Sequence, residues 1–225
     1  HGPLTRSSNL FFSDNNEYTN SNSMQAKNDF ICTSLIEISD EIFTNSANIK
    51  SDEGCQSIII VKCRFENIII PDNSQSESVL SIIHIKNTEL FINDSNFLNC
   101  ISNSKITDSY VCHTIYVAEN IEHDVYINNC QFNNNGYESS PYGTIILLKN
   151  SNNVQISFTE FQSDQKFASA IQSIYTNNIN LSYNTFTKMI ESVSIQNSIN
   201  VSINSCIFDS NKVQPSDSSQ IGTDK

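Results

Sequence analysis

Basic residues are scarce in this sequence, and their scarcity restricts the partners that the protein can bind. Lys and Arg together number 12 against 24 Asp and Glu, which gives a formal net charge of −12 at neutral pH. Nucleic acids and anionic lipid surfaces are bound through clusters of Lys and Arg that neutralise phosphate groups. We therefore expect no nucleic-acid partner, and a polyuronate substrate would be repelled.

Long hydrophobic runs are also lacking. No stretch of about 20 apolar residues occurs, so we expect no direct membrane insertion. The N-terminus does not have the pattern of a signal peptide, and we interpret the chain as a fragment without its own signal or anchor. Trp is absent, and Gly and Pro number only five and four, so Asn and Ser are expected to form most turns.

A frame of eight residues that ends in Phe recurs seven times along the chain. It reads apolar, any residue, apolar, two polar, small or polar, any residue, Phe. The spacing between successive Phe residues varies from 22 to 35. The copies end at Phe43, Phe65, Phe97, Phe132, Phe161, Phe186 and Phe208. A fixed core with connections of variable length is typical of a solenoid whose insertions form loops.

The alternation inside the frame indicates a strand. The residues seven and five before each Phe are aliphatic, as in Val201 and Ile203, whereas the residue between them varies freely. Period-two alternation of this kind predicts a half-buried strand with the aliphatic side chains inward, and a helix would need spacings of three and four. Small polar residues four before Phe, such as Ser39 and Asn93, predict a bend there.

One frame is too short to form a sheet alone, so the copies are expected to stack. Parallel pairing at ~4.8 Å per coil would give seven coils and a rod roughly 34 Å long. We predict an all-β fold, a right-handed parallel β-helix solenoid of about seven coils around one apolar core.

Three frames resemble a known repeat. Residues 127–132, 181–186 and 203–208 are similar to the coil repeat of right-handed parallel β-helices of the pectin-lyase-like architecture. Residues 132–135 and 208–211 also match the Phe-x-x-Asn half of the repeat in polymorphic-membrane-protein-like surface proteins. Its Gly-Gly-Ala-Ile/Leu companion is missing. The resemblance implies an extracellular, adhesin-like β-helix.

The chain divides into three parts by composition. Residues 1–33 are predicted to form an N-terminal cap, within which residues 1–3 resemble an expression scar. Residues 34–211 are predicted to form the parallel β-helix, with loops at 72–78, 99–111 and 133–142. Residues 212–225 are polar and are interpreted as a C-terminal tail or cap.

The seven cysteines fall into two groups. Cys63, Cys130 and Cys206 lie two residues before Phe, where the side chain should point inward, and at least two rungs separate them. That separation, ~9.5 Å, exceeds the reach of a disulfide, so buried free thiols are expected. The alternatives left open are disulfides between Cys100 and Cys112 and between Cys32 and Cys55.

The sequence offers little catalytic chemistry. Arg occurs only at positions 6 and 64, and no column of carboxylates follows adjacent coils, so no catalytic residues, metal ligands or cofactor are assigned. The alternative is a carbohydrate-active enzyme of the pectin-lyase-like type. Glu89 and Asp124, both eight before Phe on adjacent coils, have the separation that a glycosidase pair requires, but no cleft is evident.

One outward column is unusually apolar. Ile59, Phe91 and Tyr126 lie six residues before Phe on successive coils, and Glu89 and Asp124 flank them. We define these five residues as the candidate binding stripe. Side chains in register would form an apolar floor with polar neighbours, which is typical of ligand sites. The alternative is that loop 72–78 or 99–111 covers the column.

These patterns predict an extracellular or cell-surface module that binds a glycan or a protein partner. The chain carries three Asn-x-Ser sequons, which begin at Asn93, Asn180 and Asn200. If the protein is extracellular, Asn180 is the expected carrier, because it points outward from its strand.

Overall fold

The structure, a computed structural model, describes residues 29–70, 79–102, 111–137, 144–163 and 169–211. This part of the chain consists of β-strands and turns and contains no helix. The strands form three parallel sheets of seven strands each and a shorter one of three strands.

Sheets A, B and C each contain one strand from every coil. Sheet A contains β1 (Asp29–Cys32), β4 (Asn48–Ser51), β8 (Val79–Lys86), β12 (Val111–Ala118), β16 (Thr144–Lys149), β19 (Ser169–Ile174) and β22 (Glu191–Gln196). Sheet B contains β2 (Leu35–Ser39), β5 (Ser57–Val61), β9 (Glu89–Asn93), β13 (Val125–Asn128), β17 (Val154–Ser157), β20 (Asn177–Ser182) and β23 (Ile199–Asn204). Sheet C contains β3 (Ile42–Thr44), β6 (Arg64–Glu66), β10 (Asn96–Leu98), β14 (Gln131–Asn133), β18 (Glu160–Gln162), β21 (Thr185–Thr187) and β24 (Ile207–Asp209). The short sheet D contains β7 (Ile69–Ile70), β11 (Ile101–Ser102) and β15 (Gly136–Tyr137).

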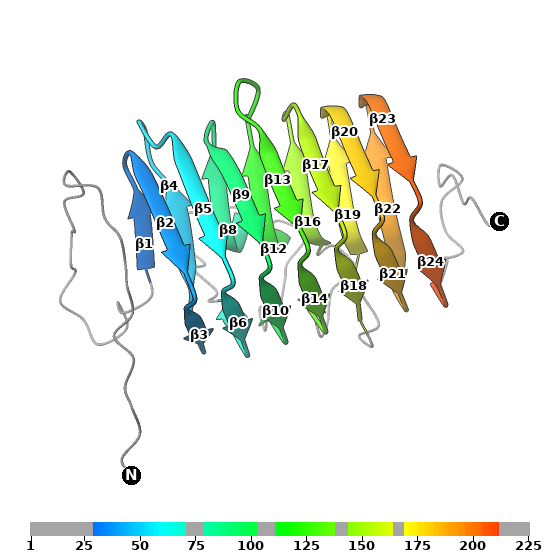
Figure 1. Cartoon of the computed structure of the whole chain (residues 1–225), viewed down its shortest axis with the longest axis horizontal. Helices are drawn as coiled ribbons and strands as arrows, with labels where there is room; N and C mark the ends of the chain where they lie inside the picture. Colours follow the sequence, from blue (N-terminus) through cyan, green and yellow to red (C-terminus); the bar gives the residue numbers. More distant parts are fainter. Residues whose placement is uncertain (1–28, 71–78, 103–110, 138–143, 164–168, 212–225) are drawn as a thin grey trace, which may run out of the picture.

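The chain passes through sheets A, B and C in turn and then starts the next coil, as Figure 1 shows. All neighbouring strands pair in parallel, and the frames are aligned residue by residue. The prediction of an all-β parallel β-helix of about seven coils is therefore confirmed.

The Phe residues that define the frame form a continuous stack through the core. Their ring centroids are 4.6–5.1 Å apart from Phe43 to Phe208, and their planes differ by 15° or less. Those from Phe65 to Phe186 are almost completely buried. Since stacked aromatic rings attract beyond the burial of their area, this stack fixes the register of every coil.

The corner between sheets B and C differs by one residue from the prediction. The residues four before Phe still pair in the sheet, as Ser39 does with Val61. The turn is made three before Phe, where the backbone φ is positive at Asp40, Lys62, Asp94, Asn129, Phe158, Tyr183 and Ser205. Three of the position-four side chains form a ladder along the outside: Asn128 Nδ2 donates to Asn93 Oδ1 over 2.8 Å, and Ser157 Oγ donates to Asn128 Oδ1 over 2.9 Å.

Polar side chains that point inward at the corners link successive coils. Asn184 is completely buried; its Oδ1 accepts from the Thr159 amide at 3.0 Å, and its Nδ2 donates to Ile156 O at 2.8 Å. Asn135, the Asn of the Phe-x-x-Asn match, makes the same pair of bonds to the coil before it. These side chains therefore satisfy the amides of Thr159 and Cys100, which burial would otherwise leave unpaired.

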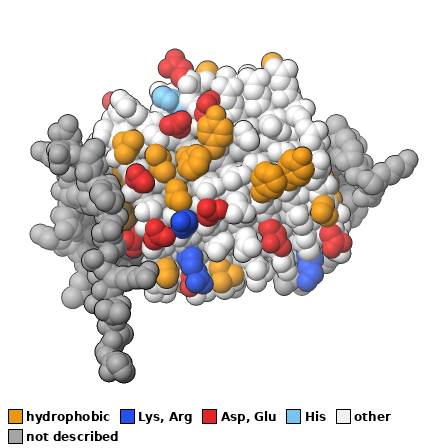
Figure 2. Space-filling model, viewed as in Figure 1, with side chains coloured by type: hydrophobic (Ala, Val, Ile, Leu, Met, Phe, Trp, Pro, Cys, Tyr) orange, Lys and Arg blue, Asp and Glu red, His pale blue; other side chains and the backbone are white. Residues whose placement is uncertain are grey.

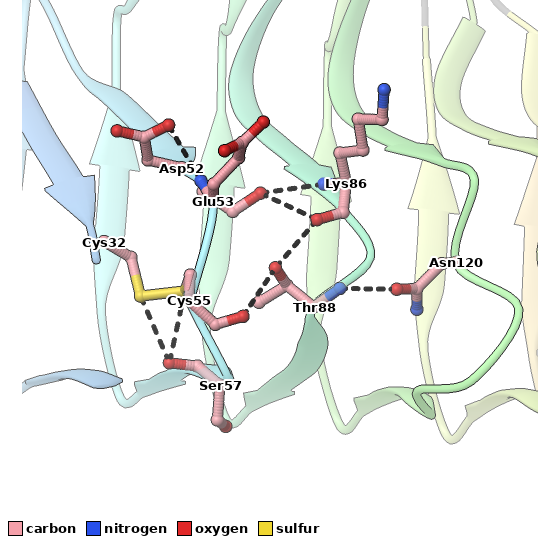
Figure 3. The surroundings of a disulfide bond; sticks show 9 residues. Cys32, Asp52, Glu53, Cys55, Ser57, Lys86, Thr88 and Asn120 are labelled. Carbon is pink, nitrogen blue, oxygen red and sulfur yellow. Dashed lines mark hydrogen bonds between the residues drawn. A yellow bond between two sulfur atoms is a disulfide. The ribbon is translucent and has the colours of Figure 1, made fainter. Parts of the chain in front are cut away.

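Of the two disulfides that the sequence left open, the structure contains one. Cys32 and Cys55 form a disulfide with a Cα–Cα distance of 5.3 Å (Figure 3). The pairing of Cys100 with Cys112 is wrong, because Cys100 is a free thiol. Its side chain points into the core, where Sγ lies 3.5 Å from Phe65 O of the coil before it. Cys63 and Cys130 are buried free thiols, as predicted, whereas Cys206 is a free thiol that is half-buried.

The last coil departs from the predicted burial. Val201 and Ile203 align with buried Ile179 and Leu181, so they occupy the inward columns, yet they are 36% and 44% exposed. No described coil follows to cover them. At the other end, Asp29–Cys32 form β1; residues 1–28 of the predicted cap and the tail 212–225 lie outside the described residues.

Candidate functional site

The structure places the three central residues of the candidate binding stripe side by side in sheet B. Ile59 of β5 pairs with Phe91 of β9, and Phe91 pairs with Tyr126 of β13. They lie between Glu37 on one side and Gln155 on the other. The column that the frame predicted is therefore one row of outward side chains on three adjacent strands.

These side chains are accessible to different extents. Phe91 is 37% exposed, and Ile59 and Tyr126 are half-buried. The rings of Phe91 and Tyr126 are 6.5 Å apart and tilted by 54°. Figure 2 shows hydrophobic side chains gathered on this face with acidic side chains among them. Of the two loops predicted as a possible cover, loop 72–78 and residues 103–110 of loop 99–111 lie outside the described residues.

The two carboxylates of the candidate binding stripe lie beside its apolar row. Asp124 lies just before β13 and accepts a hydrogen bond from the Tyr126 hydroxyl over 2.9 Å. That bond and the charge of the carboxylate raise the pKa of the Tyr126 hydroxyl, so it stays a neutral donor. Glu89 opens β9 on the adjacent coil, and both carboxylates are half-buried. The stripe therefore combines an apolar surface with acceptors along one edge.

A second surface feature was missed by the sequence reasoning. Phe158 and Tyr183 occupy the positive-φ position of the B–C corner on adjacent coils, with φ values of 51° and 57°. Their rings are stacked at 4.9 Å with an angle of 4° between planes, and they are 58% and 57% exposed. Figure 2 shows a pair of hydrophobic side chains apart from the larger group. The signal was available: two aromatic residues interrupt a column of mostly small or charged polar residues three before Phe.

This aromatic pair borders an open groove with polar walls. The groove is lined by Asp94, Asn96, Asn129, Cys130, Gln131, Phe158, Thr159, Glu160, Tyr183 and Thr185. Asn129 Nδ2 donates to Asp94 Oδ1 over 2.6 Å, and Asn93 Nδ2 donates to Asp94 Oδ2 over 2.8 Å. The Asp94 carboxylate is therefore held in place by amides from its own and the next coil.

Another open groove lies at the corner between sheets A and B. An ion pair between Lys86 Nζ and Glu119 Oε2, 2.8 Å apart, forms one part of its lining. Ile121 and Tyr175 contribute apolar surface and are more than half exposed. An exposed ion pair of this kind contributes little to stability.

Metal-ligating side chains do not converge in the described part of the chain. No group of three or more His, Cys, Asp or Glu residues there has the geometry to hold an ion. Within the same residues, no helix is long and apolar enough to cross a membrane.

Comparison with known proteins gives no relative: no protein-family model, no curated protein and no solved structure matches the chain.

Proposed function

We propose that this chain is an adhesin-like interaction module, a β-helical rod that presents the candidate binding stripe to a partner at a surface. The observation that carries the proposal is the row of Ile59, Phe91 and Tyr126, which are aligned on adjacent strands and partly exposed. Partly exposed apolar residues bordered by polar groups are typical of interaction sites. The Phe-x-x-Asn matches at Asn135 and Asn211 add support for a relation to β-helical surface proteins.

The stripe suits a protein partner better than a sugar. Phe91 and Tyr126 are tilted by 54°, so they offer edges and an aliphatic neighbour rather than one flat ring face. Aromatic residues that are partly exposed in this way commonly anchor protein contacts. The bordering carboxylates, Glu89 and Asp124, would favour a partner with basic or hydroxyl groups at the rim of the contact.

The disulfide supports an extracellular or cell-surface location for this module. Bonds such as Cys32–Cys55 persist in oxidising compartments and are rare in the cytosol. Asn180 is exposed and its sequon lies on the outer face of β20, whereas Asn93 is held in the Asn ladder and its sequon Ser95 is buried. We expect a glycan on Asn180 and none on Asn93. Mass spectrometry of the protein secreted from eukaryotic cells checks this; a glycan on Asn93 would contradict the accessibility argument.

The binding proposal is tested with arrays of defined protein ectodomains and of glycans, probed in parallel with the wild-type protein and with Phe91→Ala. We expect at least one ectodomain to bind, and Phe91→Ala to weaken that binding by at least about tenfold, the scale of a contact anchor. The unfolding temperature should change little, because Phe91 lies outside the core. Tyr175→Ala is the matched control, since Tyr175 is an exposed aromatic residue on another corner.

Three outcomes would overturn the proposal. They are no binding on either array, binding that Phe91→Ala leaves unchanged, and loss of the fold in Phe91→Ala. A hydrolysis assay on the same glycans tests the carbohydrate-active alternative, and turnover would favour it over the binding module.

A further inference from the structure

We infer that the groove beside Phe158 and Tyr183 is a binding site for a neutral sugar ring. This inference does not depend on the stripe, because the groove lies at the B–C corner and none of the stripe residues lines it. The first observation is the backbone conformation of Phe158 and Tyr183. Both aromatic residues have positive φ, a conformation that is uncommon outside Gly, Asn and Asp and unfavourable for bulky side chains.

The other coils place non-aromatic side chains at this position of the corner. Asp40, Lys62, Asp94 and Asn129 precede the pair in the same column, and Ser205 follows it. Asn and Asp tolerate the left-handed conformation because their short side chains bond locally. Two adjacent aromatic residues in this column are therefore poor choices for folding alone. Strained residues of this kind gather at ligand sites, where the surrounding structure holds them in place.

The geometry of the rings is that of a recognition surface. Stacking at 4.9 Å buries one face of each ring against the other, and each side chain remains more than half exposed. The column continues beyond the pair with the short side chains of Asn129 and Ser205. The outer ring faces are thus bordered by short residues rather than by further aromatic rings. A ligand of ring thickness can extend the stack on the groove side.

The polar side chains that line the groove indicate which class of ligand it suits. A sugar ring has a C–H face that packs on an aromatic ring and hydroxyl groups around its edge. Amide and hydroxyl side chains that can bond such groups line the groove at Asn96, Asn129, Gln131 and Thr185. The carboxylates of Asp94 and Glu160 add acceptors. No Lys or Arg is among the lining residues, and the chain carries a net charge of −12, so an acidic sugar would be repelled.

A cationic ligand fits less well. Quaternary ammonium groups are held in cages in which several aromatic rings face one ion. Here the two rings face each other, and Asp94 is already bonded by two amide groups, from Asn93 and Asn129. The combination of a stacked pair with amide-rich walls points to a hydroxylated ring.

The test uses five proteins: the wild type, Phe158→Asn, Tyr183→Asn, Tyr175→Asn and Phe91→Ala. Each is titrated by calorimetry with neutral oligosaccharides of glucose, mannose, galactose and N-acetylglucosamine, with a uronic-acid oligosaccharide and with tetramethylammonium. We expect the wild type to bind a neutral oligosaccharide, and Phe158→Asn and Tyr183→Asn to lose at least about tenfold in affinity, the scale of a lost aromatic contact.

Stability provides an independent readout. Asn suits the left-handed backbone, so each of the three variants that gain Asn should unfold about 2–4 °C above the wild type. Tyr175→Asn is the matched control, because Tyr175 is an exposed aromatic residue with positive φ on the A–B corner. It should gain stability and keep its sugar affinity. Phe91→Ala should also keep it, which separates a failure here from a failure of the stripe.

The inference is overturned if no neutral oligosaccharide binds at millimolar concentration, or if only the uronic-acid oligosaccharide or tetramethylammonium binds. It is also overturned if Phe158→Asn and Tyr183→Asn bind as the wild type does. Lower stability of these two variants together with unchanged sugar affinity, and with Tyr175→Asn raised in stability, would show that the pair is structural and would reject the site.

Discussion

His113 is a titratable side chain enclosed in the core, within β12. It is completely buried; its Nδ1 lies 3.2 Å from Thr144 O, and its Nε2 has no partner. A carbonyl can only accept, so Nδ1 carries the proton in the neutral ring. Burial lowers the pKa of His113 from 6.5 to about 3, so the folded protein holds the neutral form at physiological pH.

This residue should make the fold sensitive to mild acid. A pKa that is depressed on folding contributes stability above the unfolded value of 6.5, and that stability is lost as the pH falls towards the folded value near 3. Between pH 7 and pH 5 the wild type should lose about 2 kcal/mol more than His113→Gln, which cannot titrate. Urea unfolding at both pH values checks the difference. Equal losses would mean that His113 is protonated in the folded protein.

At the scale of the element, the inward Asn residues join one coil to the next. Asn184→Leu removes the acceptor of the Thr159 amide and the donor to Ile156 O, and leaves both buried groups unpaired. We expect a loss of roughly 2–4 kcal/mol in the free energy of unfolding. Asn180→Leu, on the outer face of the same coil, is the matched control and should change stability by less than about 0.5 kcal/mol. Similar losses in the two variants would contradict the inward assignment.

The elements could be predicted where one physical rule governs each position. The alternation of aliphatic residues at fixed distances before Phe predicted the strands of sheets B and C. It also predicted that Cys63 and Cys130 point inward. The bend between sheets B and C was predicted one residue too early. Asn and Ser are common in turns, but they can also bond along the outside of the sheet, and Asn93 and Asn128 do so.

Other features depend on contacts between distant residues. Spacing alone could not distinguish Cys32–Cys55 from Cys100–Cys112, because the choice depends on which side chains the coil turns inward. The Phe158–Tyr183 pair was missed although both residues depart from the polar residue that the frame places three before Phe. What marks them is a backbone conformation that the pattern does not report.

For the whole molecule, the burial of a side chain depends on the position of its coil along the stack as well as on its position in the frame. Ile156 and Ile203 occupy the same column, five before Phe, but Ile156 is completely buried and Ile203 is 44% exposed. Ile156→Asp would place an unpaired charge in the core and should cost more than about 4 kcal/mol, enough to prevent folding of many domains. Ile203→Asp should cost far less. Thermal unfolding of both variants checks this, and equal shifts would show that the last coil is covered as well.

Five hydrogen bonds at the corners run from a backbone amide of one coil to a side-chain oxygen of the next coil. Asn120 accepts from Thr88, Ser95 from Cys63, Asn135 from Cys100, Asn184 from Thr159, and Ser198 from Thr176. In a partial stack, these corner amides of the last coil have no hydrogen-bond partner until the next coil forms. During synthesis, when the chain emerges N-terminus first, each finished coil is a template that its successor completes. The rod can grow at the ribosome in the order in which it is translated, one coil at a time.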